Sequence, residues 1–535
     1  MKIIYPFFLF ICFSSLAHGQ AQLRGWHLSD PVKTSYYGIS LKETYDLINE
    51  KKLKSVPVIV AILDDGIDTS HEDLQSALWI NSKEIAGNGV DDDKNGFVDD
   101  LHGWNFLGNA AGVNVGSNSS EWIRVYWRYK AMYEGKTVDT TSMSRAQKFE
   151  YAQWVKSRAG VVGKGMKQSE LDNIQQYLRN ALYCDSLLRK HFPSAEYTQK
   201  QLEDFKPATS HEKEVRKFFL EVFAQFDAPD ISNRLALDEL TTYVVGQVRV
   251  ASGDKVPPED NRRDITSDDE TLWDTKTYGN NDVSNGELMH GSHLAGIIAA
   301  SRKNGIGMQG IAENVQVMMV RTSAEGDEYD KDIAKGIRYA VDNGAKVINM
   351  SFGKSLSPDK TFIDDAVKYA LQKDVLIVQA AGNSRRDIDG FDNYPNPRYL
   401  FTDSLAPNWI TVGASDTLGH PASFSNYGKN LVDLFAPGVA IYSTIPKENK
   451  YMAWDGTSMA APVVSGIAAM LRSYFPQLSA VEIKSILLES VTLPKSPVGK
   501  GANAAEKNLD QLSKTGGIVN ALAAFQAALK RRSGP

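Results

Sequence analysis

Three short segments, far apart in the sequence, carry side chains that together could perform nucleophilic chemistry. Asp64 closes an apolar run, His290 follows a loop and opens a predicted helix, and Ser458 stands just before a helix rich in small residues. A carboxylate can orient an imidazole, an imidazole can take up a proton, and a hydroxyl that has lost its proton attacks a carbonyl carbon. These residue types therefore predict a nucleophilic triad with Ser458 as its nucleophile.

Each of the three residues also has a simpler interpretation. Ser458 could be only the N-cap of its helix, His290 a solvated surface histidine, and Asp64 part of a solvated acidic turn. A serine at a helix N-terminus, however, lies among backbone N–H groups without helical partners, where the helix dipole favours negative charge. The same position suits a developing oxyanion. The three residues together favour the chemical interpretation.

The elements that must position these residues alternate between strands and helices. Five segments are apolar on both faces, as in the central strands of a parallel sheet. Amphipathic helices are expected between several of them, for example over residues 329–343 and 361–373. This alternation predicts an α/β fold with helices on both faces of the sheet and a site at the carboxyl ends of its strands. The five strand segments are residues 56–63, 315–320, 345–350, 375–380 and 409–413.

A long stretch from residue 107 to residue 284 interrupts the alternation. It is polar, aromatic and helical in period, so we expect a mainly helical inserted subdomain there. The catalytic domain would then consist of a first part at 56–106 and a second part at 285–535. Apolar stripes on the inserted helices are most simply the core of the subdomain, and the alternative is a surface that docks a partner. The stripes are Trp122, Val125, Tyr126, Tyr129 and Met132; Leu171, Ile174, Leu178, Ala181, Leu182 and Leu188; and Val215, Phe218, Phe219, Val222 and Phe226.

The N-terminus has the pattern of a secretory signal peptide. One lysine precedes an apolar stretch, and Ala17-His18-Gly19 resembles a cleavage site just before Gln20. We therefore expect residues 1–19 to be a signal peptide and the chain to be exported to the periplasm, the cell surface or the medium. A lipoprotein anchored through Cys12 is the alternative, and the bulky residues before Cys12 disfavour it. Residues 20–55 would form a short N-terminal segment.

Composition narrows the classes of function. The chain has 535 residues, of which 42% are hydrophobic and 23% charged, as in a globular protein with more than one structural unit. Its net charge of −6 leaves no basic excess to neutralise phosphates, which argues against nucleic-acid binding. No stretch is long enough for a transmembrane segment. Without Cys12, Cys184 is the single cysteine, so stability must come from a large core or a metal rather than a disulfide.

The motifs around the three candidate residues resemble those of a known family. Asp64-Asp65-Gly66, His290-Gly-Ser-His-Leu-Ala-Gly296 and Gly456-Thr-Ser-Met-Ala-Ala-Pro462 are similar to the motifs of the subtilisin-like serine proteases, or subtilases. The resemblance implies a three-layer α/β sandwich with a mostly parallel central sheet and a secreted serine endopeptidase. It also implies that Asp64 orients His290, that His290 acts as general base and then general acid, and that Ser458 attacks the peptide carbonyl.

Further segments fit the same resemblance. Asn383 matches the residue whose side-chain amide, with the backbone N–H of Ser458, would bind the oxyanion. The segment Ser351, Phe352 and Gly353 resembles the strand at the edge of the substrate cleft, which would pair with an extended peptide or protein substrate. Ala381 and Gly382 would complete the wall of the pocket for the side chain before the scissile bond. Residues 393–395 are a weaker candidate for its floor.

Several features depart from the family pattern. Ser292 replaces a more usual threonine, and an insertion of roughly 175 residues separates Asp64 from His290. Only about 36 residues lie between the signal peptide and the first strand, too few for the usual folded pro-domain. One hypothesis is that the insertion takes over the role of assisting folding.

Asp65 stands where serine or threonine is commoner in the family. Because successive side chains of a strand point to opposite sides, we expect Asp65 to point away from His290 and toward the substrate cleft. A similar Asp-Asp-Gly occurs in the kexin and furin branch, where the second Asp favours a basic substrate residue two positions before the cut. The resemblance thus implies a modest preference for Lys or Arg at that position.

A second strong pattern is an acidic loop. Asp91, Asp93 and Asn95 alternate before Gly96, and Asp99 follows, close to the first nine positions of an EF-hand-type loop. Oxygen ligands from Asp91, Asp93, Asn95, the Phe97 carbonyl and Asp99 would converge on a structural Ca²⁺ ion. His102 occupies the position of the usual final glutamate, so the last ligand would be Asp100 or another group. The alternative is a solvated acidic turn.

Two other classes of function remain as alternatives to an endopeptidase. One is a catalytically inactive subtilisin-like scaffold that binds peptides or a partner through the inserted helices. The other is a calcium-dependent structural or surface-binding protein. The sequence leaves the physiological substrate and the oligomeric state open.

Overall fold

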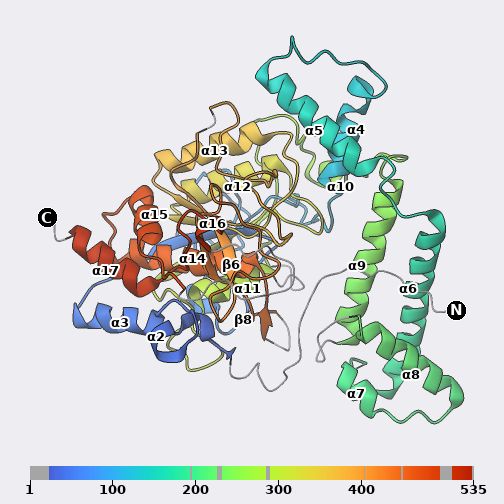
Figure 1. Ribbon diagram of the computed structural model, residues 1–535, viewed down its shortest axis with the longest axis horizontal. Coiled ribbons are helices and arrows are strands. Elements are labelled where there is room, and N and C mark those ends of the chain that lie inside the picture. The colour runs from blue at the N-terminus through green and yellow to red at the C-terminus, as the bar shows by residue number, and fades with distance from the viewer. Residues whose placement is uncertain are drawn as a thin grey trace. The chain divides into compact units, whose positions relative to one another are not determined.

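The computed structural model describes residues 23–192, 195–225, 232–284, 290–402, 404–446, 450–494 and 509–532. The expected signal peptide and Cys12 lie outside these residues. The chain divides into two compact units, whose parts can be followed by colour in Figure 1. The helical unit comprises residues 122–137 and 154–258, and the sheet unit comprises residues 22–121, 138–153 and 259–535.

Within the described residues, the sheet unit contains a seven-stranded sheet in the order β2-β3-β1-β4-β5-β6-β7. Every neighbouring pair of these strands is parallel, which confirms the predicted α/β class. All five segments predicted as central strands are present, and β1 lies between β3 and β4. The strands are β1 (Val58–Asp64), β2 (Gly103–Asn105), β3 (Val315–Arg321), β4 (Val347–Met350), β5 (Leu376–Ala380), β6 (Trp409–Ser415) and β7 (Leu434–Pro437).

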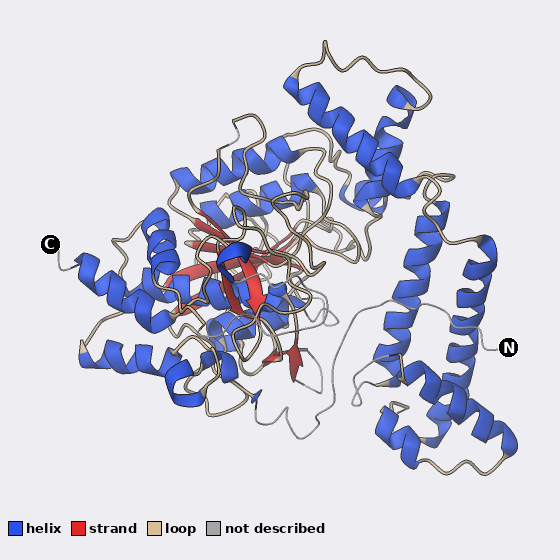
Figure 2. Ribbon diagram, in the orientation of Figure 1, coloured by secondary structure: helices blue, strands red, loops and turns tan. Residues whose placement is uncertain are grey.

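Helices cover both faces of this sheet, as the alternation of β1 side chains shows. Val60 and Ile62 belong to a core that also contains residues of α11 (His290–Ala299) and α14 (Thr457–Tyr474). Ala61 and Leu63 belong to a second core with α12 (Asp330–Asp342) and α13 (Lys360–Gln372). Figure 2 shows the strands of this unit in red between its blue helices. The three-layer sandwich predicted from the resemblance is therefore confirmed.

The N-terminal segment is part of the sheet unit. Trp26 is 2% exposed and its Nε1 donates to the Val439 carbonyl at 2.9 Å. Tyr45 on α3 (Leu41–Glu50) donates through its hydroxyl to the Ile311 carbonyl at 2.9 Å. Residues of α3 join the same core as α15 (Ala480–Glu489) and α17 (Ala521–Arg532). Shorter elements of this unit are η1 (Trp26–Leu28), α2 (Pro31–Thr34), η2 (Gln75–Ala77), α10 (Asn261–Thr266), α16 (Leu509–Leu512) and an antiparallel pair, β8 (Ile441–Thr444) with β9 (Tyr451–Trp454).

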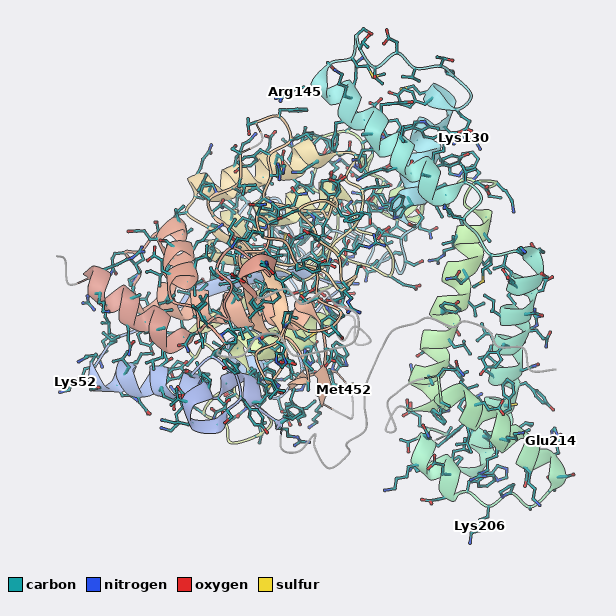
Figure 3. The ribbon with its side chains drawn as sticks, viewed as in Figure 1. Lys52, Lys130, Arg145, Lys206, Glu214 and Met452 are labelled. Carbon is teal, nitrogen blue, oxygen red and sulfur yellow. The ribbon has the colours of Figure 1, made fainter. Side chains whose placement is uncertain are left out.

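The helical unit has a core of its own. Its α6 (Gln168–Leu188), α8 (Ser210–Phe223) and α9 (Asn233–Ser252) share a buried cluster that includes Leu188 and Phe219. The apolar stripes predicted on α6 and α8 thus lie largely in this core, while Phe226 lies outside the described residues. Charged side chains such as Lys206 and Glu214 are exposed (Figure 3). Two shorter elements of this unit are η3 (Arg189–His191) and α7 (Gln199–Asp204), while α4 (Glu121–Tyr133) and α5 (Arg145–Val161) begin in the sheet unit and end in the helical unit. No described helix of the chain is apolar and long enough to span a bilayer.

The two ends of the insertion belong to the sheet unit. The backbone N–H groups of Asn105 and Asn280 donate to each other's carbonyls at 2.8 and 3.1 Å, and Asn114 Oδ1 accepts from both side-chain amides. Arg262, fully buried, forms ion pairs with Asp268 at 2.9 Å and Asp332 at 2.5 Å. Residues 107–121 and 259–284 are therefore anchored to the sheet, and the compact helical unit is shorter than the expected insertion of 107–284.

Candidate active site

The three candidate catalytic residues come from three different elements of the sheet unit. Asp64 is the last residue of β1, His290 is the first residue of α11, and Ser458 is the second residue of α14. Asp64 Oδ1 lies 2.8 Å from His290 Nδ1, and its side chain is 3% exposed. The structure therefore brings the predicted acid and base into hydrogen-bond contact. Because Nδ1 faces the carboxylate, the other ring nitrogen, Nε2, is left to exchange a proton with a nucleophile.

The electrostatics of this pair favour a charged imidazole. Burial of the ring lowers the pKa of His290, but the charge of Asp64 and its hydrogen bond outweigh burial and raise the pKa to about 9. Trp454 on β9 lies nearly parallel to the imidazole, with ring centroids 6.4 Å apart. The same indole stacks on the His293 ring, with ring centroids 4.7 Å apart. The His293 Nε2 lies 3.0 Å from the carbonyl oxygen of Met452, which is labelled in Figure 3.

Ser458 lies in the first turn of α14, next to the end of β4. Its hydroxyl donates to the Ser351 carbonyl at 2.9 Å, and the Ser351 hydroxyl donates to the Ser458 carbonyl at 2.9 Å. The Ser458 proton therefore points to Ser351 in this structure. Attack on a carbonyl needs the Ser458 Oγ at His290 Nε2, and the described hydrogen bond of this hydroxyl goes to Ser351 instead.

Asn383 follows β5 and is fixed by the residue before Ser458. Its side-chain Oδ1 accepts from the Thr457 backbone N–H at 2.9 Å and from the Thr457 hydroxyl at 2.8 Å. Because Oδ1 is held in this way, the donor Nδ2 occupies the other side of the carboxamide, and Asn383 itself is exposed. Sequence reasoning missed Asn426, whose Oδ1 accepts from the backbone of Ser384 and Arg386 and whose Nδ2 donates to the Ala381 carbonyl. This residue comes from a distant loop without a motif.

The predicted walls of the substrate pocket also come together. Ser351 and Gly353 follow β4, and Ala381 and Gly382 follow β5. Asn393 bridges the two walls, because its Nδ2 donates to the Ala381 carbonyl at 3.2 Å and its Oδ1 would lie 3.2 Å from a Cβ at Gly353. Phe352 is half-buried and packs against the core beneath α12 and α13. Asn393 therefore lies between the two segments predicted as pocket walls.

The prediction that Asp65 points away from His290 is wrong. Asp65 Oδ1 accepts the backbone N–H of Gly291 at 2.8 Å, and Oδ2 accepts that of His290 at 3.3 Å. The strict alternation of a strand does not extend to Asp65, because β1 ends at Asp64 and Gly66 turns the chain with a φ of 145°. The carboxylate is thus turned to the start of α11 rather than to a free position in the cleft.

The acidic loop is arranged differently from the predicted ligand set. Carboxylate oxygens of Asp91 and Asp93 lie within 4.8 Å of each other and of Glu84, which sequence reasoning missed because it precedes the motif. Asp99 instead accepts the backbone N–H groups of Asn88 and Gly89 at 3.2 and 2.9 Å. Asp99 is therefore not in the group of three carboxylates.

Two other predicted ligands of this loop have additional contacts. The Asn95 Oδ1 accepts the Phe97 N–H at 2.8 Å, and its Nδ2 donates to Asp100 at 3.1 Å. The Phe97 ring packs edge-on against Trp104 and Tyr339, with centroids 5.0 and 4.7 Å away. Phe97 thus ties the loop to the core beside the sheet.

Comparison with known proteins gives consistent matches. A sequence model described as the subtilase family matches residues 57–516. The chain is 39% identical over 237 residues to the thermophilic serine proteinase of Bacillus sp. (strain AK1), covering 44% of this chain and 55% of that protein. It is 40% identical over 204 residues to subtilisin Savinase of Lederbergia lenta, covering 38% of this chain and 70% of that protein.

The extent of these matches is limited. The chain spans about half the length of several of the curated relatives that it matches. Among solved structures, a cold adapted subtilisin-like serine proteinase is 30% identical, with a TM-score of 0.35, over 45% of this chain and 76% of that chain.

Proposed function

The chain belongs to the subtilase family of serine-type endopeptidases, and we propose that it hydrolyses peptide bonds through an Asp64–His290–Ser458 triad. The hydrogen bond of 2.8 Å between Asp64 and His290 carries this proposal. These two residues are 226 positions apart in the sequence and meet at the carboxyl end of β1, where open α/β sheets place their sites.

The proposed reaction uses the three residues in turn. His290 Nε2 takes the proton of Ser458 Oγ, which attacks the substrate carbonyl carbon, while Asp64 stabilises the imidazolium that forms. The oxyanion receives hydrogen bonds from the Asn383 Nδ2 and the backbone N–H of Ser458. The imidazolium then gives its proton to the leaving amine. In the second half of the reaction, water gives a proton to His290 Nε2 and attacks the acyl carbon, and the imidazolium returns the proton to Ser458 Oγ as the acid leaves.

An extended peptide or protein is the substrate class that the cleft supports. Ser351 to Gly353 continue from β4 and offer backbone groups for strand addition. Ala381 and Gly382 face them, with Asn393 between the two segments. The carboxamide of Asn393 narrows this pocket and gives it a polar floor, which favours a small side chain before the scissile bond.

A structural calcium ion is the second part of the proposal. Glu84, Asp91 and Asp93 each place a carboxylate oxygen within 4.8 Å of the others, and a cation would offset the repulsion that remains beside the backbone N–H groups that they accept. Lys83 is the nearest basic group with a described contact, 4.0 Å from Asp93, and its side chain is 76% exposed. The donors Glu84, Asp91 and Asp93 are hard oxygen ligands and fit Ca²⁺, with waters or backbone carbonyls completing the shell. Bound there, calcium would supply stability rather than chemistry.

Export is the third part. The pattern of residues 1–19 supports a signal peptide. An exported protein without a pair of cysteines needs a large core or a bound metal for its stability, because no disulfide bond can supply it. The periplasm, the cell surface and the medium are the compartments that this export would reach.

A serine-directed fluorophosphonate probe tests the enzyme against the two alternatives. We expect covalent labelling of the wild type in the presence of calcium and none of Ser458→Ala. Asn383→Ala should still be labelled but should hydrolyse peptides about 10²–10³-fold more slowly, the magnitude known for one oxyanion-hole donor of a subtilisin. An unlabelled wild type that binds peptides would instead favour an inactive scaffold. An unlabelled wild type without peptide binding would favour the structural calcium-binding protein.

A further inference from the structure

Asp65 connects the acid and the base of the proposed triad through the backbone. Its two carboxylate oxygens accept the backbone N–H groups of Gly291 and His290, at 2.8 and 3.3 Å. Its own N–H donates to Asp64 Oδ1 at 2.9 Å, the same oxygen that lies 2.8 Å from His290 Nδ1. Asp65 therefore contacts both partners of the acid–base pair without contacting the imidazole itself in any described hydrogen bond.

The backbone of Asp65 is held from the other side. Arg321, the last residue of β3, is 2% exposed and donates through Nε to the Asp65 carbonyl at 2.7 Å. Its Nη1 donates to the Asp282 carbonyl at 3.0 Å. Because β3 pairs with β1 up to Asp64, the guanidinium fixes the residue after the strand to the sheet. The backbone that bears the Asp65 carboxylate is consequently fixed to the sheet.

The contact between this turn and α11 is close. A Cβ at Gly291 would lie 2.2 Å from the Gly66 carbonyl oxygen and 3.1 Å from Asp65 Oδ1. No side chain fits there, so the first turn of α11 rests directly on the Asp64-Asp65-Gly66 turn. A serine at position 65 would have a shorter side chain and one acceptor atom, whereas aspartate offers two oxygens and a charge for two amides.

We propose that Asp65 is a positioning residue of the triad, whose carboxylate holds the first two backbone amides of α11 and thereby keeps the His290 imidazole on the Asp64 carboxylate. This inference rests on the proposed peptidase function. It is a different role from the preference for Lys or Arg predicted from the sequence, since both oxygens accept backbone N–H groups of the helix.

The charge of Asp65 has a second consequence for His290. Burial, followed by the charge of Asp64, raises the pKa of Asp65 to about 7. The ionised carboxylates of Asp64, Asp65 and Glu328 all act to raise the pKa of His290 against its burial. The other charged groups facing Asp65 are Arg321 and, beyond it, Asp282. Removing the Asp65 charge should therefore lower the pKa of His290, and the neutral base should become available at lower pH.

Three substitutions separate the two effects. Asp65→Asn keeps an acceptor oxygen but removes the charge, Asp65→Ser supplies a shorter neutral acceptor, and Asp65→Ala supplies none. We expect Asp65→Asn to move the acid limb of kcat/KM down by about 0.5–1 pH unit. We expect Asp65→Ala to lose at least about tenfold in kcat at every pH with little change in KM, and Asp65→Ser to recover most of that loss.

The matched control is Asp68→Asn, which removes a negative charge from the same loop. The Asp68 Oδ1 accepts the Ser70 N–H at 2.9 Å, and no described contact joins its carboxylate to α11. We expect this variant to leave the acid limb of kcat/KM in place. A shift as large as that of Asp65→Asn would show a general charge effect and overturn the positioning role.

Two further measurements make the outcome decisive. A proton NMR titration of the His290 ring, in the Ser458→Ala background, should show a lower pKa with Asp65→Asn, and it does not depend on activity. Peptides with Lys or Ala two positions before the cut should be affected equally. An unchanged titration, or a loss confined to the Lys peptide, would overturn the inference. An inactive wild type would contradict the proposed function instead, and the titration would still decide the role of Asp65.

Discussion

The Ser458 hydroxyl and the Ser351 carbonyl form a hydrogen bond of 2.9 Å, and the Ser351 hydroxyl returns one of the same length to the Ser458 carbonyl. The nucleophile is thus held at the cleft edge rather than on its base. The same Ser351 carbonyl is an acceptor for a substrate N–H in the proposed strand addition. A bound peptide would therefore compete for Ser351 and release the Ser458 hydroxyl toward His290.

Substrate backbone amides should consequently affect catalysis as well as binding. N-methylation of the substrate amide that pairs with Ser351 removes its N–H donor. The Ser458 hydroxyl then keeps its hydrogen bond to the Ser351 carbonyl. We expect kcat to fall by at least about tenfold, beyond the increase in KM. Steady-state kinetics on a series of singly N-methylated peptides checks this. If every methylation changes KM alone, Ser351 does not control the nucleophile.

The pH dependence of the activity follows from His290. Its pKa is raised above the ordinary 6.5 to about 9, because the Asp64 charge and hydrogen bond exceed the effect of burial. A general base must be neutral, so kcat/KM should rise as the pH increases through this raised pKa. We expect the acid limb of a pH–rate profile to lie above pH 6.5.

The same shift affects stability in the opposite direction. Since the folded-state pKa of His290 exceeds the unfolded value, the contribution of the charged His290 to the free energy of unfolding is complete below pH 6.5 and disappears as the pH rises through about 9.

Asp64→Asn is the control for the pH–rate profile. It should move the acid limb of kcat/KM to lower pH and reduce kcat by about 10⁴-fold. An acid limb below pH 6.5 in the wild type would contradict the raised pKa.

The central part of the site could be predicted from the sequence, because it depends on short motifs and strand ends. The strand segments are apolar on both faces, and Asp64 ends one of them, which already places it at the mouth of a parallel sheet. Asp65 could not be predicted in the same way, since alternation stops where β1 stops. Only the turn at Gly66, with its φ of 145°, directs the second carboxylate to α11.

Other residues were missed because their partners are distant in the sequence or because a turn redirects them. Glu84 reaches the acidic loop from a preceding turn, where its Oε1 accepts the N–H groups of Asp92 and Asp93 at 3.0 and 3.1 Å. Asp99 has a left-handed backbone with a φ of 53°, which turns its carboxylate to Asn88 and Gly89. Spacing alone contains no information about either geometry.

Asn393 should determine which side chains enter the pocket before the scissile bond. Its carboxamide lies between Gly353 and Ala381, so Asn393→Gly should deepen the pocket and remove its polar floor. We expect the ratio of kcat/KM for Phe over Ala at this substrate position to rise about tenfold or more, as expected for a change of several methylene groups. Profiling on a peptide library measures this ratio.

Phe391→Ala is the control for the Asn393→Gly variant. Phe391 lies in the same segment and is 57% exposed, so Phe391→Ala should leave the preference unchanged. An unaltered profile in Asn393→Gly would show that the pocket floor is formed by other residues.

Calcium removal should destabilise the sheet unit through the acidic loop. A ligand at 100 times its Kd stabilises the folded state by about 2.7 kcal/mol, so a chelator should lower the Tm by several degrees. We expect Asp93→Asn to abolish the Tm response to calcium, because Asp93 belongs to the group with Glu84 and Asp91. Asp99→Asn should retain the response, since Asp99 is bonded to Asn88 and Gly89. Differential scanning calorimetry with and without chelator distinguishes these cases, and an unchanged wild-type Tm would exclude a structural calcium ion.

Most of the helical unit, residues 167–249, should be removable without loss of the active site. The buried cluster of α6, α8 and α9 lies within residues 181–244, so its deletion exposes no part of that cluster in the remaining chain. A Cβ at Gly165 would lie 2.3 Å from the Ala251 Cα, so the backbone segments at these two residues are in direct contact. A short linker can therefore join the two chain ends that the deletion leaves. We therefore expect a chain in which a few Gly and Ser residues replace 167–249 to fold and to hydrolyse small peptides within about threefold of the wild-type kcat/KM.

The deletion also tests whether the insertion assists folding in place of a pro-domain. Refolding from urea should give similar yields of active enzyme with and without residues 167–249, because the sheet unit has its own cores on both faces. The matched variant Phe219→Asp puts a charge into the fully buried position of the helical cluster and should unfold that unit at full chain length. If both variants were soluble but inactive after refolding, and regained activity when the separate helical unit was added, the insertion would be a folding catalyst for the sheet unit.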